Sequence, residues 1–215
     1  MQRNAYIAYN RYCMNFKSIE PQILYFGTPV ALITTIDEKG HANIGPISSV
    51  WALGWTMFLG LECGSKTYQN LLAQKECVVN FPTANLFNKV EKIATLTGAN
   101  PIPDYKKGRY QYDADKFKTG GFSQMPSETV APPRIAECPL QFEATYKTAV
   151  RVDDDPKEAG PVAAIQVRIV KVHADDKLIV KENHIDPTKW NPLIYNFRHY
   201  YGLGDELGKT FKAEV

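Results

Sequence analysis

The stretch Cys63-Gly64-Ser65-Lys66-Thr67 joins an apolar run to a segment with helical periodicity. Ser65 occupies the position of an N-cap, whose hydroxyl satisfies a backbone amide of the first helical turn. The amides that follow lie at the positive end of the helix dipole, and the Lys66 ammonium and Thr67 hydroxyl add further donors. These groups predict a phosphate site, although the same residues are also typical of a simple helix cap. The spacing is not GxxxxGK[ST], so the pattern does not indicate a nucleoside triphosphate.

A second segment, "NIGPISSV" over residues 43–50, carries Gly45 and Pro46 inside a predicted strand. Because proline cannot donate to a strand ladder, the segment is expected to be an edge strand or a bulged one. A broken ladder leaves backbone N–H and C=O groups free for a flat ring that carries carbonyls and ring nitrogens. An edge strand that ends in two serines explains the same residues without a ligand.

The elements around these segments are mostly strands. Alternating or β-branched apolar residues predict strands over 28–36, 42–50, 55–62, 76–82, 140–150 and 162–172. The first of these is apolar on both faces and is expected to be covered on both. Helical periodicity predicts helices over about 66–74 and over 85–96, and "DDDPKEAG" over 153–160 reads as a turn. In the last strand, the alternation changes phase after Ile169, which predicts a β-bulge.

This order predicts a closed or nearly closed antiparallel barrel, because closure removes exposed strand edges. The length of 215 residues allows one sizeable core. Between the second helix and the fifth strand, residues 97–135 are rich in Pro, Gly and Tyr and show little periodicity. A segment that long without structure of its own is more often a functional loop or lid than a linker.

Composition excludes several classes of function. The net charge is +2 and the basic residues are scattered, which argues against a nucleic-acid partner and against a membrane surface. The four cysteines form no CxxC pair, so neither a disulfide framework nor a metal site is expected. No apolar run has the length of a signal or a membrane span, so a cytoplasmic location is the default expectation.

Taken in order, several segments resemble the flavin reductase-like family of FMN-binding split barrels. They are "LYFGTPVALITT", "ANIGPISSVWAL", "MFLGLECGSKTYQNL", "ECVVNFP", "PSETVAPPRIAECPLQFEA" and "HYYGLGDELGKTF". The resemblance runs from about Met14 to the C-terminus. It implies a single domain over 14–215, with residues 1–13 as an N-terminal extension. The implied fold is mainly β: a six-stranded antiparallel Greek-key split barrel with short peripheral helices.

The family resemblance also implies a cofactor, FMN, and a homodimer with flavin near the subunit interface. The ring of FMN would lie along one set of residues, namely Pro46, Ile47, Ser48, Ser49 and Val50. Its phosphate would be held by Ser65, Lys66, Thr67 and Asn70, with Cys63 and Gly64 beside them. The implied activity is that of an NAD(P)H-dependent flavin reductase, which passes a hydride to flavin N5 and electrons to an oxygenase or another acceptor. No catalytic residue is assigned, because the flavin carries the reaction.

Two alternatives remain open at this point: a flavin-binding electron carrier or sensor without nicotinamide activity, and a split barrel that binds another ligand. Aromatic residues of the long loop are expected either to cover the flavin or receive a nicotinamide, or to fix the loop to the barrel; they are Tyr105, Tyr110, Tyr112 and Phe117. His184 and His199 are possible proton donors or substrate contacts, although surface histidines are commoner. The glycines of "YGLGDELG" lack the GxGxxG spacing of a dinucleotide site, so a tight C-terminal turn, packed or at an interface, is expected instead.

Overall fold

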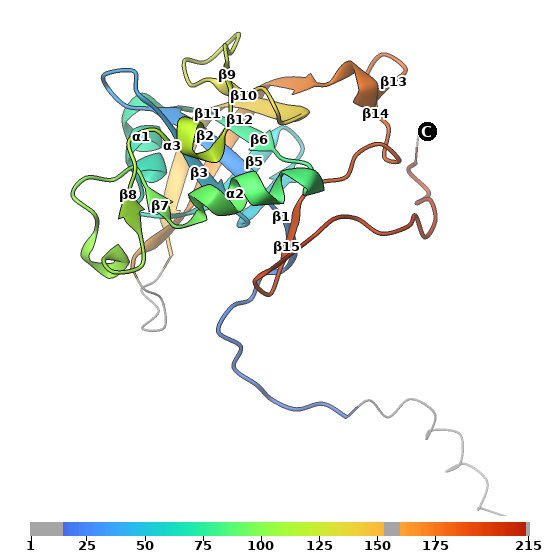
Figure 1. Cartoon of the computed structure of the whole chain (residues 1–215). Coiled ribbons are helices and arrows are strands. Elements are labelled where there is room, and N and C mark those ends of the chain that lie inside the picture. The colour runs from blue at the N-terminus through green and yellow to red at the C-terminus, as the bar shows by residue number, and fades with distance from the viewer. Residues whose placement is uncertain (1–14, 153–159, 214–215) are drawn as a thin grey trace, which may run out of the picture.

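A computed structural model of the chain describes residues 15–152 and 160–213. The predicted extension 1–13 and nearly all of the predicted turn at 153–160 lie outside these residues. Seven antiparallel strands form the main sheet, in the spatial order β3-β2-β6-β11-β12-β5-β4 (Figure 1). They are β2 (Ala31–Ile36), β3 (Ala42–Ile47), β4 (Val50–Leu53), β5 (Thr56–Glu62), β6 (Glu76–Phe81), β11 (Leu140–Arg151) and β12 (Val162–Ala174).

The two edges of this sheet are joined in sequence. Strands β3 and β4 lie at opposite ends of the spatial order, yet only Ser48 and Ser49 separate them along the chain. The sheet must therefore curl until its edges meet at these two serines. Counted as one interrupted strand, β3 and β4 close the seven strands into a ring of six, and every pairing is antiparallel. The predicted mainly β split barrel is confirmed.

The barrel interior follows the alternation of the sequence. Along β5, Met57, Leu59 and Leu61 are buried while their neighbours are only half-buried. On β12, pairing with β11 steps from Lys171 opposite Glu143 to Ile169 opposite Ala144, so Val170 is the extra residue of a bulge. The predicted bulge is confirmed, and Val170 and the following Val172 are exposed.

Strand β2 is buried on both faces, as its sequence predicts. Ala31 and Ile33 face the interior, whereas Leu32 belongs to an outer apolar cluster with residues of two helices. These helices are α2 (Phe87–Ala94) and α3 (Lys116–Gly120), which contribute Val90, Ile93 and Phe117. Full burial of such a side chain stabilises the fold by about 1.5–3 kcal/mol. This outer layer holds the α2–α3 region against the barrel, beside the split.

The predicted strand over 28–36 is two strands in the structure. Strand β1 (Phe26–Pro29) pairs with β15 (Ile194–Asn196) near the C-terminus, and β2 begins only at Ala31. Between them, the Val30 amide donates to the Leu193 carbonyl at 2.8 Å. Pro29 has no N–H to continue a ladder, so the chain changes partners at this point.

Helix α1 (Lys66–Gln74) has the predicted bounds, but the second helix ends earlier than predicted. It begins with a 3-10 turn, η1 (Ala84–Leu86), and ends at Ala94, because Leu96 pairs with Gln111 as a short strand. The 97–135 segment also contains more structure than its sequence indicates. Besides α3 and Thr97, the last residue of the Leu96 strand, its elements are η2 (Asp104–Lys106), β8 (Gln111–Tyr112), β9 (Gln124–Met125) and β10 (Arg134–Ile135). The remaining elements are β7 (Leu96–Thr97), η3 (Asp176–Leu178), β13 (Ile179–Val180), β14 (His184–Ile185) and β16 (His199–Tyr201).

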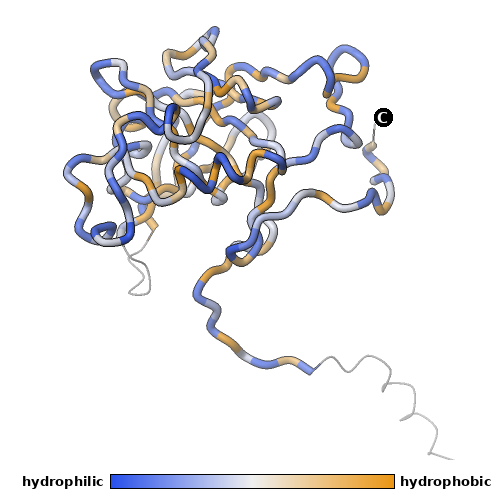
Figure 2. Tube along the Cα trace, in the orientation of Figure 1, coloured by the Kyte–Doolittle hydropathy of each residue, from blue (hydrophilic) through white to orange (hydrophobic). Residues whose placement is uncertain are grey.

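Both ends of the described chain are extended and exposed, and Figure 2 shows apolar residues on them, away from the barrel. The tight turn predicted in "YGLGDELG" is wrong: after Tyr201, residues 202–210 form no turn or regular element. The start of this segment is held by a bond from the Leu203 amide to Asn191 Oδ1 at 2.8 Å, while the side chains of Leu203 and Leu207 are exposed. Among the described residues, no helix is long and apolar enough to cross a membrane.

Candidate functional site

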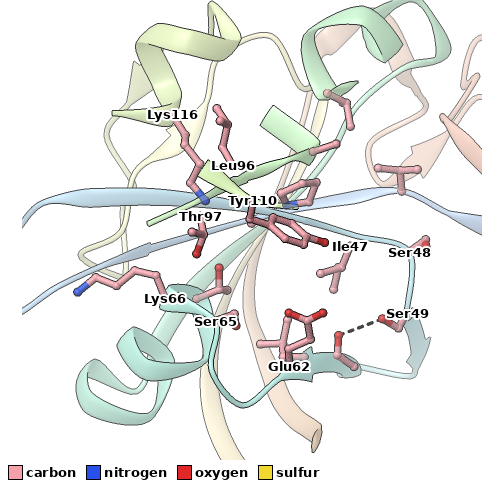
Figure 3. Close-up of a pocket in the computed structure, with 18 of the residues that line it drawn as sticks. Ile47, Ser48, Ser49, Glu62, Ser65, Lys66, Leu96, Thr97, Tyr110 and Lys116 are labelled. Carbon is pink, nitrogen blue, oxygen red and sulfur yellow. Dashed lines mark hydrogen bonds between the residues drawn. The ribbon is translucent and has the colours of Figure 1, made fainter. Parts of the chain in front are cut away.

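A cavity of about 300 Å³ lies at the split of the barrel. Three parts of the chain form most of its wall: the junction of β3 and β4, the start of α1, and the segment from α2 to α3 (Figure 3). Further lining residues come from the end of β5 and from the paired ends of the chain, namely Gly60, Leu61, Glu62, Tyr25, Val30, Tyr195 and Tyr200. Its walls combine apolar residues such as Ile47 and Leu96 with hydroxyls and three lysines. Such a mixture suits a ligand with a flat apolar body and an anionic end.

The junction of β3 and β4 forms one wall. Pro46, Ile47, Ser48 and Ser49 line the cavity, whereas Val50 is 5% exposed and packs in the inner core. The Ser49 hydroxyl donates to the Gly60 carbonyl at 3.0 Å, and the Gly60 amide donates to the Ser49 carbonyl at 2.7 Å. These bonds fix the interruption between the two strands, so the irregular backbone at Ser48 is held in place.

The start of α1 forms the second wall. Ser65 has an extended backbone conformation, and its hydroxyl accepts a hydrogen bond from the Tyr68 amide at 3.2 Å, so it is the predicted N-cap. Thr67 is 4% exposed, and its hydroxyl accepts a bond from Asn43 Nδ2 at 3.0 Å. The first-turn amides of Lys66 and Thr67 have no acceptor inside the helix. They remain available to an anion.

Two features of this wall fit a ligand with a phosphate. A methyl group added at Gly45 would overlap the Thr67 hydroxyl, so only glycine lets β3 approach the helix start this closely. The Oδ1 atom of Asn43 is buried and has no hydrogen-bond partner among the described residues. An unpaired buried polar atom beside free amides indicates a site built for a polar ligand group.

The three lysines of the cavity have different surroundings. Lys66 Nζ lies 3.9 Å from Asp37 Oδ2, and Figure 3 shows its side chain directed away from the other labelled residues. Lys106 forms an ion pair with Glu62, and its Nζ lies 4.8 Å from the centre of the Tyr110 ring. Lys116 is 5% exposed and points from α3 toward Thr97. Burial, and then the charge of Lys106, lower the pKa of Lys116 to about 8.

Not every predicted site residue borders the cavity. Besides Val50, three residues near α1 have other neighbours: Cys63 packs against the inner core, Gly64 lies against Tyr105, and Asn70 donates to Thr35 Oγ1 at 3.2 Å. His184 and His199 do not line it either.

The aromatic residues of the long loop have separate roles. Tyr110 lines the cavity, while Tyr105 contacts Gly64 and Gly160 and so fixes the loop to the barrel. Phe117 is buried in the outer cluster, and Tyr112 is exposed. These four aromatic residues, predicted as one group, therefore have different places in the structure: one lines the cavity, one fixes the loop, one is in the core and one is exposed.

Sequence reasoning missed several residues of the cavity region, namely Asn43, Glu62, Thr97, Lys106 and Lys116. Asn43 could have been found, because it shares a face of β3 with Gly45 and Ile47 by the period of two. The two lysines belong to a segment without periodicity, so no pattern placed them beside α1.

Comparison with known proteins places the chain in a family. Residues 23–204 match the model of the flavin reductase like domain. A protein of Bacillus subtilis (strain 168) named uncharacterized protein YdfE is 45% identical over 201 residues, covering 93% of this chain and 95% of that protein.

Solved structures share the fold. Flavoredoxin of Desulfovibrio vulgaris (Miyazaki F) superposes with a TM-score of 0.75 at 21% identity, covering 93% of this chain and 99% of that one. Nitrilotriacetate monooxygenase component B from Bacillus cereus gives a TM-score of 0.72 at 17% identity, covering 91% and 100%. At these identities the likeness concerns the fold.

The barrel, its split and the cavity there define the class of flavin-related split-barrel oxidoreductases. Within this class, the chain belongs to the flavin reductase-like family.

Proposed function

We propose that the protein is an FMN-dependent oxidoreductase that uses NADH or NADPH to reduce its flavin. The observation that carries this proposal is the continuity of one cavity between the interrupted strand at Ser48 and the free amides at the start of α1. A flavin mononucleotide has a planar ring at one end and a phosphate at the other, and the two walls offer groups for each.

Each wall has a definite task in this proposal. Pro46 and Ile47 contribute apolar surface, and the backbone at Ser48 and Ser49 offers hydrogen-bonding groups to the edge of the ring. The phosphate lies at the start of α1, where Thr67 can donate its hydroxyl proton because the oxygen already accepts from Asn43. Asn43 itself does not line the cavity, and its part is to hold the Thr67 side chain in place.

When bound, FMN would supply the hydride chemistry, and the chain would supply binding and orientation. Tyr110 reaches into the cavity from the long loop (Figure 3). The Lys106 ammonium over its ring and the Glu62 carboxylate hold Tyr110 and the loop in this position. Water is thereby partly excluded from the site in which the ring would lie.

We further propose that the protein is a homodimer. Trp51 and Leu53 of β4 are 55% and 70% exposed, and Val150, Val170 and Val172 are exposed on β11 and β12. Trp51 stacks on Phe58 with ring centres 4.3 Å apart, so the apolar surface continues along β5. An apolar face of this kind on a sheet usually has a protein partner. Ser49 precedes Trp51 on the same face, so a second copy seated there would border the cavity.

Electrons from the reduced flavin would pass to a partner protein, to oxygen or to a small acceptor. The fold shared with a monooxygenase component B supports an oxygenase as one such partner. Ser49 lines the cavity and lies on the same face of the sheet as Trp51, so an electron acceptor bound at this apolar face would be close to the flavin.

An anaerobic nicotinamide titration tests the activity. Protein loaded with FMN is mixed with NADH or NADPH without oxygen, and the visible flavin absorbance is followed. A reductase loses this absorbance at a rate that rises with the concentration of the nicotinamide. Retained absorbance with both nucleotides, together with full bleaching by dithionite, would contradict the proposal and favour a flavin-binding electron carrier.

A further inference from the structure

Lys116 is a buried lysine for which the fold provides no partner. It is 5% exposed, it lines the cavity, and its Nζ forms no hydrogen bond or ion pair with any residue in 15–152 or 160–213. Desolvating an ammonium without an acceptor is costly, so such a residue destabilises the empty protein. Figure 3 shows its side chain descending from α3 toward Thr97 and Tyr110, into the cavity.

The charged groups near Lys116 are already engaged. Lys106, which disfavours a second positive charge nearby, is paired with Glu62. Asp113 favours the charged form of Lys116, but its two carboxylate oxygens accept bonds from the Asp115 amide at 2.7 Å and the Thr119 hydroxyl at 2.6 Å. The nearest carboxylates thus have other donors.

The carboxylate of the helix packed against α3 also has another donor. On α2, Lys89 donates to the Gly121 carbonyl and lies 3.5 Å from Glu137, and Glu91 accepts a bond from Tyr200. Strand β3 carries no ionisable side chain on the stretch Ala42–Ile47. No described side chain near Lys116 has a carboxylate left for it, so a ligand in the cavity that Lys116 lines can supply the acceptor.

The opposite wall indicates what this acceptor is. The first-turn amides of Lys66 and Thr67 and the Thr67 hydroxyl donate toward the same cavity, while the Lys66 ammonium lies beside Asp37. A phosphoryl dianion has enough acceptor oxygens to bind these donors and Lys116 together. A carboxylate has only two oxygens and would leave some of these donors without an acceptor.

We propose that Lys116, rather than Lys66, supplies the positive charge that binds the phosphoryl group of the ligand, and that Lys116 takes up a proton when this group binds. This rests on the proposed function, in which the ligand is FMN. Burial and the charge of Lys106 lower the pKa of Lys116 to about 8, so above that pH the empty site holds mostly the neutral amine. The dianion favours the ammonium, and the proton comes from the buffer, so one amine becomes one ammonium for each phosphoryl group bound.

Isothermal titration calorimetry of the flavin-free protein tests this directly. FMN and riboflavin, which has the same ring and no phosphate, are titrated at about pH 8.5 in two buffers of different ionisation enthalpy. The difference in heat between the buffers gives the protons taken up. FMN is expected to take up most of one proton and riboflavin none. Relative to riboflavin, the affinity for FMN is expected to fall on the order of tenfold between about pH 8 and pH 9.5.

Two variants complete the test. Lys116→Met keeps the length and apolar stem of the side chain, and Lys118→Met removes an exposed lysine of the same helix as a matched control. Lys116→Met is expected to lose affinity for FMN by about 10- to 100-fold at neutral pH, to lose proton uptake, and to bind riboflavin normally. Lys118→Met should behave like the unaltered protein.

Separate outcomes overturn the two proposals. Tight FMN binding without proton uptake, or normal FMN affinity in Lys116→Met, would overturn the role of Lys116 and leave FMN binding intact. Failure of the unaltered protein to bind either flavin at any pH would overturn the proposed function itself.

Discussion

Replacing Gly45 with alanine should disturb both the fold and the proposed phosphate site. The added methyl would overlap Thr67 Oγ1 and lie 3.2 Å from Thr67 Cβ. Thr67 is buried and bonded to Asn43, so it cannot turn away without breaking this bond. Overpacking of this kind costs about 1–3 kcal/mol of unfolding free energy.

The effect on ligand binding follows from the same displacement. If the Thr67 hydroxyl moves, the phosphate loses one hydrogen bond to a charged group, which is worth about 1.5–3 kcal/mol or about 10- to 100-fold in Kd. Flavin fluorescence titration measures FMN and riboflavin affinity, and urea unfolding measures stability. Gly204→Ala is the matched control, because a methyl there has no neighbour within 4 Å.

A double variant separates the two effects. Removing the overlapping hydroxyl with Thr67→Ala should restore most of the stability lost in Gly45→Ala, since the two changes act on one contact. It should not restore the affinity for FMN. If Gly45→Ala unfolds at the same urea concentration as the unaltered protein and binds FMN equally well, the close approach of β3 to α1 is not the basis of the site.

Three further predictions concern the phosphate donors, the stability at low pH, and the dimer. Thr67→Ala should weaken FMN binding about 10- to 100-fold, with little change for riboflavin in a fluorescence titration; equal losses for both flavins would contradict the phosphate assignment. Burial alone would raise the pKa of the Glu143 carboxyl, but bonds from the Thr129 hydroxyl, from two backbone amides and from His173 lower it to about 2. As the pH falls from about 5 to about 2, the Glu143 carboxyl is protonated in the unfolded chain before it is protonated in the folded one. The free energy of unfolding, measured by urea titration, should therefore fall by about 2 kcal/mol over this range. The Glu143→Gln variant should not show this fall. Trp51→Glu should shift the protein from dimer to monomer in light scattering, because it buries a charge in the proposed apolar interface; an unchanged mass would exclude this face.

Helix starts and bulges could be predicted from the sequence where a short residue pattern is compatible with only one local structure. Ser65 before an apolar period of three and four residues fixed the start of α1, because a capping hydroxyl and an amphipathic face define the same boundary. The change of alternation after Ile169 likewise predicted the bulge at Val170. The strand that contains Pro46 is indeed at an edge of the sheet, but its pairing with β2 continues to Ile47, and the interruption falls at Ser48 and Ser49.

Long-range placement could not be predicted in the same way. Lys106 and Lys116 lie 40 and 50 residues after the start of α1 at Lys66, in a segment of short elements, and only the folded loop brings them to the cavity. The sequence assigned the positive charge to Lys66, since it adjoins the cap, whereas the structure directs that side chain toward Asp37. The split of the 28–36 strand was also missed, because its partner β15 comes from the far end of the chain.

The visible absorbance spectrum of the purified protein tests the central claim most directly. It is recorded as purified and again after adding FMN and filtering away the unbound flavin. The cavity at the split predicts flavin absorbance retained at about one FMN per chain, and retention should fall when riboflavin replaces FMN. A colourless protein that retains neither flavin would contradict the assignment of this cavity as a flavin site.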